Sequence, residues 1–114
     1  MAREKYKPEI IKAYFKEIGL PEPVFEFVYI PNRKFRLDIA FPEWRVGLEV
    51  QGGLFIKAAH STGAGIRRDM EKRNLGILEG WSVLECEPEN VCMAETAWMI
   101  KMALQLKGWK NDQS

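Results

Sequence analysis

The sequence has few of the residues that disulfide-stapled, zinc-binding or membrane proteins need. Its 114 residues include two cysteines and one histidine. Cys86 and Cys92 are too far apart for a Cys-x-x-Cys motif, and His60 alone completes no conventional zinc site. We expect no membrane span, because no apolar run approaches about 20 residues, and the N-terminus shows no apolar signal segment. These absences favour a reduced, cytoplasmic protein.

An excess of charge is also absent. The formal net charge is +1, so the whole chain is no polycationic nucleic-acid coat. Positive charge is concentrated locally, in the segments Arg33–Arg36, Arg67–Arg68 and Lys72–Arg73. Each segment is either a phosphate-binding cluster or an ordinary solvated face. The length and the 46% content of hydrophobic residues predict one globular domain over residues 1–114.

Periodicity and chain breakers predict seven elements in the order αβββαβα. They are a helix over Pro8–Ile18, strands over Val24–Ile30, Lys34–Phe41 and Arg45–Gln51, a helix over Ile66–Glu79, a strand over Trp81–Glu85 and a helix over Asn90–Lys107. The second helix is expected to bury the stripe Ile66, Met70 and Ile77. Such an order predicts an α/β fold, an α+β mixed sheet with helices on both faces and a parallel last strand.

The most informative feature is a predicted hairpin. In its first strand, alternation directs Phe35, Leu37, Ile39 and Phe41 to one face and Arg36, Asp38 and Ala40 to the other. If the turn Pro42–Arg45 is even in length, Asp38 faces Glu49 on the second strand, and Arg36 faces Gln51. Directly facing residues have Cβ atoms about 5 Å apart.

Two carboxylates this close repel each other unless a cation lies between them. Mg²⁺ is usually held by one or two protein carboxylates, with waters and substrate phosphates in its other positions. The pair Asp38 and Glu49 therefore predicts a nuclease-like metal site. Two alternatives stay open at this point: a solvated pair of which Arg36 neutralises one member, and an odd turn or bulge that separates the two faces.

The order of elements, with Asp38 and then Glu49-Val50-Gln51 on the hairpin, resembles the PD-(D/E)XK restriction-endonuclease-like superfamily. The chain looks most like its small phage and bacterial endonucleases related to very-short-patch repair. The matching runs are Gly19–Pro21, Phe35–Pro42, Leu48–Gly53, His60, Gly63, Gly65, Asp69–Asn74 and Gly80–Leu84. This resemblance implies a restriction-endonuclease-like core and a metal-dependent DNA endonuclease from a bacterial cell or a phage.

Residue by residue, the resemblance makes Asp38, Glu49 and the backbone carbonyl of Val50 ligands of Mg²⁺ or Mn²⁺. One departure is Gln51, because superfamily members usually carry lysine there. A neutral amide orients water but does not stabilise developing negative charge as an ammonium does. We expect Lys72 to supply the missing cation from the second helix. In the alternative interpretation, Lys72 is solvated.

The remaining candidates concern the substrate. His60 is expected at the scissile phosphate or in proton transfer, and Arg67, Arg68 and Arg36 are expected on DNA phosphates. We expect that 114 residues leave no room for a separate recognition domain. We therefore expect the enzyme to recognise DNA structure, or to depend on a homodimer or a targeting protein partner.

Two rival functions stay open. In the first, the chain is a catalytically inactive nuclease fold that binds DNA or a protein, and Gln51 marks the lost activity. In the second, it is a small structural or interaction protein whose motif is coincidental. Metal binding that depends on Asp38 and Glu49 would distinguish the enzyme from a scaffold.

Overall fold

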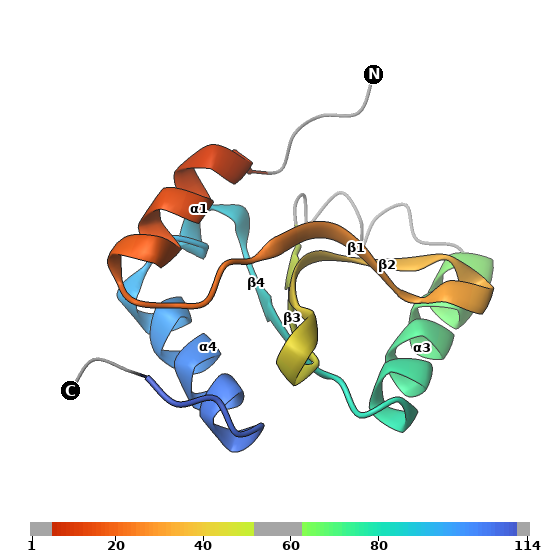
Figure 1. Ribbon diagram of the computed structural model, residues 1–114. Helices are drawn as coiled ribbons and strands as arrows, with labels where there is room; N and C mark the ends of the chain where they lie inside the picture. The colour runs from red at the N-terminus through yellow and green to blue at the C-terminus, as the bar shows by residue number, and fades with distance from the viewer. Residues whose placement is uncertain (1–5, 52–62, 112–114) are drawn as a thin grey trace.

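The computed structural model describes residues 6–51 and 63–111. Within them lie three α-helices and four β-strands, in the order helix, three strands, helix, strand, helix (Figure 1). They are α1 (Pro8–Glu17), β1 (Val24–Ile30), β2 (Phe35–Phe41), β3 (Val46–Val50), α3 (Gly63–Leu78), β4 (Ser82–Cys86) and α4 (Ala94–Leu106). The mixed α/β class is confirmed. None of these helices is long and apolar enough to cross a membrane.

The four strands form one mixed sheet in the order β1-β2-β3-β4. Antiparallel pairing joins β1 to β2 and β2 to β3, whereas β4 runs parallel to β3, as the sequence predicts. The β2–β3 pairs are Ile39 with Leu48, Ala40 with Gly47 and Phe41 with Val46. This is the register expected from an even turn. The turn itself is a 3-10 segment, Pro42–Trp44.

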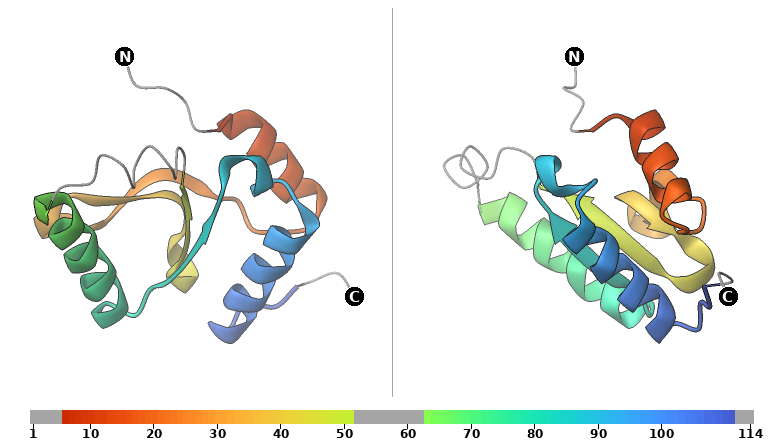
Figure 2. Two further views of the ribbon diagram at one scale, coloured as in Figure 1. Left: turned by 180° about the vertical axis from the view of Figure 1, so that it is seen from behind. Right: turned by 90° about the vertical axis from the view of Figure 1, so that its left-hand side faces the viewer.

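Helices cover both faces of the sheet. Figures 1 and 2 show α1 and α4 on one face and α3 on the other. The larger core lies under α1 and α4 and includes Ile11, Phe15, Ile39, Phe41, Val46, Leu48, Val50, Ile100 and Leu104. The smaller core lies toward α3 and consists of Tyr29, Ile30, Phe35, Leu37 and Ala40, with partly buried neighbours such as Leu75 and Trp81.

The apolar residues of β2 are divided between the two cores. Phe35 and Leu37 belong to the smaller core, whereas Ile39 and Phe41 belong to the larger one. The prediction that all four share one face is therefore wrong. The strand changes face at Asp38, between the two pairs.

The neighbouring strand explains this change. Phe25 pairs with Ile39 and contacts the larger core, while Phe27 pairs with Leu37 and contacts the smaller one. Between them, Glu26 adopts a left-handed backbone conformation with φ of 52°. A non-glycine residue is rare in this region because its Cβ crowds the backbone. The left-handed residue Glu26 lies beside Asp38, and the change in strand direction there lets β1 and β2 contribute side chains to both cores.

Helix α3 meets the sheet through a side that the apolar pattern does not predict. The expected core residues are exposed by about half or more: Ile66 by 50%, Met70 by 48% and Ile77 by 69%. Gly76 is the buried residue of α3, and a Cβ there would lie 3.1 Å from the ring of Tyr29. The Tyr29 hydroxyl donates to the Lys72 carbonyl at 3.2 Å. The helix therefore approaches the sheet along Gly76, which turns Lys72 toward the strands.

Candidate functional site

Asp38 and Glu49 hold each other's strands through their carboxylates. Glu49 Oε1 accepts a hydrogen bond from the Asp38 N–H at 3.0 Å, and Asp38 Oδ2 accepts one from the Val50 N–H at 2.7 Å. Both contacts lie just beyond the last pair of the β2–β3 ladder, Ile39 with Leu48. Each carboxylate thus takes the place of a backbone carbonyl. The predicted juxtaposition of Asp38 and Glu49 is present, and Asp38 is buried.

Lys72 reaches this pair from the opposite layer. Its Nζ lies 2.9 Å from Glu49 Oε2, and the two side chains are 24% and 20% exposed. Partial burial strengthens the Coulomb attraction of this pair relative to one in open solvent, while the loss of water around both charges opposes that gain. Of the two interpretations of Lys72, the structure shows the contact with the sheet and not the solvated side chain. Its chemical role stays a prediction.

Both carboxylates open into one cleft of about 310 Å³, here called the carboxylate cleft. Its lining residues come from β2, the turn before β2, β3 and α3: Lys34, Phe35, Arg36, Asp38, Glu49, Arg68, Asp69 and Lys72. Four of these side chains are cationic and three are carboxylates, a formal balance of +1. The exposed cations are Lys34, Arg36 and Arg68. Exposed cations therefore surround acidic side chains that are buried or partly buried.

A stacked arrangement positions one of these cations. The guanidinium of Arg68 lies 5.2 Å from the centroid of the Phe35 ring, and that of Arg33 lies 5.3 Å from it. Such cation–π contacts contribute about 0.5–1 kcal/mol at exposed sites. Arg33 also pairs with Glu71 of α3 at 2.7 Å. The turn before β2 is thereby tied to α3, and Arg68 is held at the cleft. Arg67 is exposed and does not line it.

Gln51 has a different neighbour from the one its motif position implies. Its Nε2 donates to Glu85 Oε1 at 3.0 Å. Because β3 and β4 are parallel with Glu49 beside Glu85, this acidic residue lies on the sheet next to the candidate site. The sequence reasoning missed Glu85. Alternation along Trp81, Val83 and Glu85 is the signal that places it on the same face.

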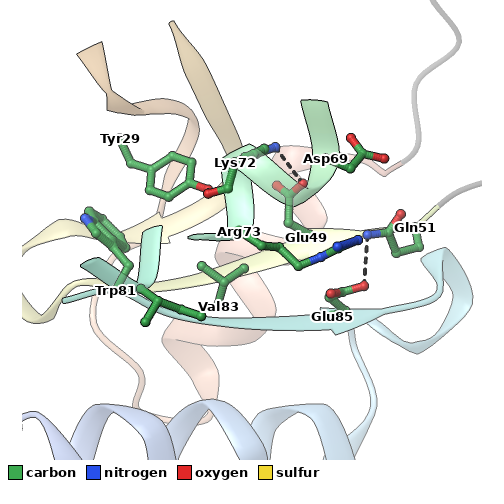
Figure 3. Close-up of a pocket in the computed structure, with 10 residues that line it drawn as sticks. Tyr29, Glu49, Gln51, Asp69, Lys72, Arg73, Trp81, Val83 and Glu85 are labelled. Carbon is green, nitrogen blue, oxygen red and sulfur yellow. Dashed lines mark hydrogen bonds and ion pairs between the residues drawn. The ribbon is translucent and has the colours of Figure 1, made fainter. Parts of the chain in front are cut away.

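A second hollow of about 150 Å³, here called the aromatic pocket, adjoins the carboxylate cleft (Figure 3). It is lined by Tyr29, Glu49, Gln51, Asp69, Lys72, Arg73, Ile77, Trp81, Val83 and Glu85. The two hollows share Glu49, Asp69 and Lys72. The Lys72–Glu49 contact therefore borders both. Nothing in the sequence reasoning pointed to Tyr29 or Trp81 here.

Tyr6 reaches the back of the site from before α1. Its hydroxyl oxygen lies 2.5 Å from Glu26 Oε2 and 3.0 Å from the Asp38 carbonyl oxygen. Burial, followed by the hydrogen bond to Glu26, raises the pKa of the Tyr6 hydroxyl well above its usual value. The hydroxyl therefore stays protonated, and its one hydrogen is shared between the Glu26 carboxylate and the Asp38 carbonyl oxygen, at the point where β2 changes face. No local pattern could reveal a contact across so many residues.

The donor set suits a hard divalent cation only in part. Across residues 6–51 and 63–111, no three Asp, Glu, His or Cys side chains gather into a metal-binding group. Two carboxylates on one cleft nevertheless suffice for Mg²⁺ or Mn²⁺, whose other ligands are waters and phosphate oxygens. A bound ion would share or displace the Lys72 contact on Glu49 Oε2. The Val50 carbonyl stays a predicted ligand, and His60 lies outside the described residues.

Comparisons with known proteins add no relative to this picture. No protein-family model matches the chain, and searches of curated proteins and of solved structures find no similar protein. The resemblance to restriction-endonuclease-like enzymes therefore stays a prediction from the sequence.

Proposed function

We propose that this protein is a Mg²⁺- or Mn²⁺-dependent DNA endonuclease with a restriction-endonuclease-like core. One observation carries the proposal. Asp38 and Glu49 are interlocked on adjacent strands, and Lys72 contacts Glu49 from the helix above. A binding surface has no need to keep two carboxylates side by side, since doing so costs electrostatic energy. A metal-dependent hydrolase does need them.

In this proposal each residue has a distinct task. Asp38 and Glu49 hold the metal ion, which when bound acts as a Lewis acid and lowers the pKa of water. Lys72 supplies a fixed positive charge beside the reacting phosphate, where negative charge develops. Gln51 lies at the motif position where related enzymes carry lysine, and its amide orients water or substrate. The cation has thus moved from strand β3 to helix α3.

The rim of the carboxylate cleft is suited to a DNA backbone. Lys34, Arg36 and Arg68 surround the carboxylates, and Arg68 is held by its stack on Phe35. Such contacts position a phosphate without reading sequence. Affinity should therefore fall as salt concentration rises, with a slope of about −0.7 per phosphate contact for single strands. Arg67 and His60 remain candidate phosphate contacts from the sequence alone.

The first test compares Lys72→Met with wild type on plasmid, linear, single-stranded and branched DNA, in Mg²⁺, Mn²⁺ or EDTA. The proposal expects cutting to fall by about 10²-fold, as when one charge-stabilising donor is removed. The metal concentration for half-maximal activity should fall as well, because the ammonium no longer competes for Glu49. Unchanged cutting by Lys72→Met would remove Lys72 from the mechanism. Wild type that cuts nothing in either metal would refute the function.

A matched control comes from another ion pair. Lys12 lies 3.8 Å from Glu22, and both side chains are more than half exposed. Lys12→Met removes the same charge far from the carboxylate cleft. It should leave both the rate and the metal dependence within about twofold, since exposed pairs contribute little. Equal losses in the two variants would mean that net charge, not the position of Lys72, is what matters.

One observation favours the inactive binding module as second candidate. Glu49 already has Asp38 N–H on one oxygen and Lys72 on the other, while Gln51 is bound to Glu85. The arrangement is therefore satisfied without a metal. An inactive module predicts DNA binding that Mg²⁺ leaves unchanged, and tighter binding by Asp38→Asn because a negative charge is lost. An enzyme predicts that Asp38→Asn abolishes cutting and metal-dependent binding.

A further inference from the structure

The aromatic pocket has the size of one ring. Its volume is about 150 Å³, and a cavity of about this size holds a single benzene-like ring. A base pair is too large for it, and so is a peptide helix. The ligand class that fits is one flat heterocycle.

The walls of the pocket are aromatic and held in place. Tyr29 and Trp81 lie edge to face, with ring centroids 5.4 Å apart, and Phe27 packs against Trp81 at 5.8 Å. Ile77 of α3 and Val83 of β4 complete the apolar lining. Because every nucleobase has a π-face, such walls bind bases with little regard to sequence.

Polar groups stand at one end of this apolar lining. Figure 3 shows the Gln51–Glu85 hydrogen bond at the pocket, with Arg73 extending toward it. A carboxylate and an amide are the side chains that accept from, and donate to, the edges of bases. Six of the ten lining residues are polar or charged, so the pocket joins an aromatic wall to hydrogen-bonding groups that can fix the orientation of a ligand. This polar end suits the edge of a base.

The position of the pocket indicates which base it takes. Glu49, Asp69 and Lys72 line both the pocket and the carboxylate cleft. We propose that the aromatic pocket receives one unpaired nucleobase of the DNA strand whose phosphate lies at Asp38 and Glu49. This inference rests on the proposed endonuclease function and names its substrate class. Unstacking a paired base costs a few kcal/mol, so single-stranded, mismatched or bulged nucleotides are preferred.

The test uses short single strands of one sequence, each with the base removed at a different position. Their affinities for the full chain are measured by fluorescence anisotropy in EDTA, and cutting is measured in Mg²⁺ and Mn²⁺. Loss of the pocketed base should weaken binding by about 5- to 150-fold, the range for one base–aromatic stack. That loss should appear at one position, beside the cut.

Two neighbouring substitutions assign the loss to the pocket. Ile77→Glu puts a carboxylate in the pocket wall, while Leu78→Glu adds the same charge at the next residue, which does not line the pocket. Ile77 and Leu78 are 69% and 78% exposed, so neither substitution disturbs the core. For each variant, the affinity for the intact strand is divided by the affinity for the strand that lacks the base. The added carboxylate repels both strands equally, so this repulsion cancels in the ratio. Ile77→Glu should bring the ratio to within about twofold of one, and Leu78→Glu should keep the wild-type ratio.

Every outcome decides the inference separately from the function. Cutting without any position-specific loss overturns the pocket and leaves the endonuclease standing. A position-specific loss of affinity that Ile77→Glu removes and Leu78→Glu keeps supports the proposed base-binding pocket. If no cutting accompanies this result, the endonuclease proposal is wrong and the inactive DNA-binding module is supported. Equal ratios in Ile77→Glu and Leu78→Glu, or no binding to any strand, overturn the pocket.

Discussion

Substitutions at Asp38 separate its structural role from its proposed role in binding metal. Asp38 Oδ2 accepts the N–H of Val50, a residue that is 1% exposed. Asparagine keeps an oxygen that can accept this hydrogen bond but removes the charge beside Glu49. Alanine removes both. The two variants should therefore differ in stability and agree in their loss of metal binding.

The magnitudes follow from the burial of the bond. Leaving a buried donor without its acceptor costs about 1–3 kcal/mol. In a chain of 114 residues, about 1 kcal/mol corresponds to roughly 4 °C in melting temperature. Asp38→Ala should then melt about 4–12 °C below wild type. Asp38→Asn should melt within about 2 °C of wild type or above it, because repulsion with Glu49 is relieved.

Thermal unfolding followed by circular dichroism, with and without Mn²⁺, measures both effects. A metal at ten times its dissociation constant stabilises the folded state by about 1.4 kcal/mol. For wild type this is a rise of about 6 °C, which both Asp38 variants should lose. Glu22→Gln, on an exposed ion pair far from the cleft, should keep the rise. An equal rise in melting temperature for Asp38→Asn and wild type would refute the metal site. An Asp38→Ala variant as stable as wild type would refute the inference that the Asp38 carboxylate stabilises the pairing of β2 with β3.

Three further predictions concern packing and titration. A Cβ at Gly47 would lie 2.5 Å from Leu37 Cδ1. Gly47→Ala should therefore lower the free energy of unfolding, measured in urea, by about 1–3 kcal/mol, and adding Leu37→Val should recover part of the loss. An unchanged urea midpoint for Gly47→Ala would contradict this prediction. Burial raises the pKa of Tyr29 to about 12 from 10.0. The stability that depends on protonated Tyr29 is thus complete below pH 10 and is lost as pH rises from 10 toward 12. The urea midpoint of Tyr29→Phe should therefore fall less over this pH range than that of wild type. An equal fall in both proteins would contradict this prediction. The exposed Cys92 should react with a thiol reagent before Cys86, because burial raises the pKa of the Cys86 thiol to about 11. Mass spectrometry of the first labelled product identifies the modified cysteine. Labelling of Cys86 first would contradict this prediction.

The hairpin was predictable because its determinants are local. A strand has a period of two, and a turn of even length sets which residues face each other. Those two facts give the register that the structure shows up to Ile39 with Leu48, and the Asp38 and Glu49 carboxylates meet just beyond that pair. The mixed α/β class follows in the same way from segments of helical and strand period. Proline and glycine mark where those segments end.

The faces presented by β2 and α3 were not predictable by the same means. In β2 the change of face depends on a left-handed residue of the neighbouring strand, Glu26, which its own sequence context does not reveal. In α3 the apolar residues Ile66, Met70 and Ile77 suggest a core stripe. The absence of a side chain at Gly76 decides the approach instead, because it lets the helix lie against Tyr29. Hydrophobic periodicity reports where apolar residues lie, not which side of a helix can come close.

The carboxylates and the cation are carried by different layers of the fold, the sheet and helix α3. Asp38 and Glu49 are tied to the strands closed by α1 and α4, whereas Lys72 is carried by α3, whose buried residue is Gly76. An element with so little buried surface opens locally at a lower free energy than the whole protein. Amide hydrogens of α3 should therefore exchange with solvent well before those of β2 and β3. Sub-global opening of α3 would remove Lys72 from Glu49 and leave the carboxylates interlocked, so the proposed activity would be lost by heat or denaturant before the fold is.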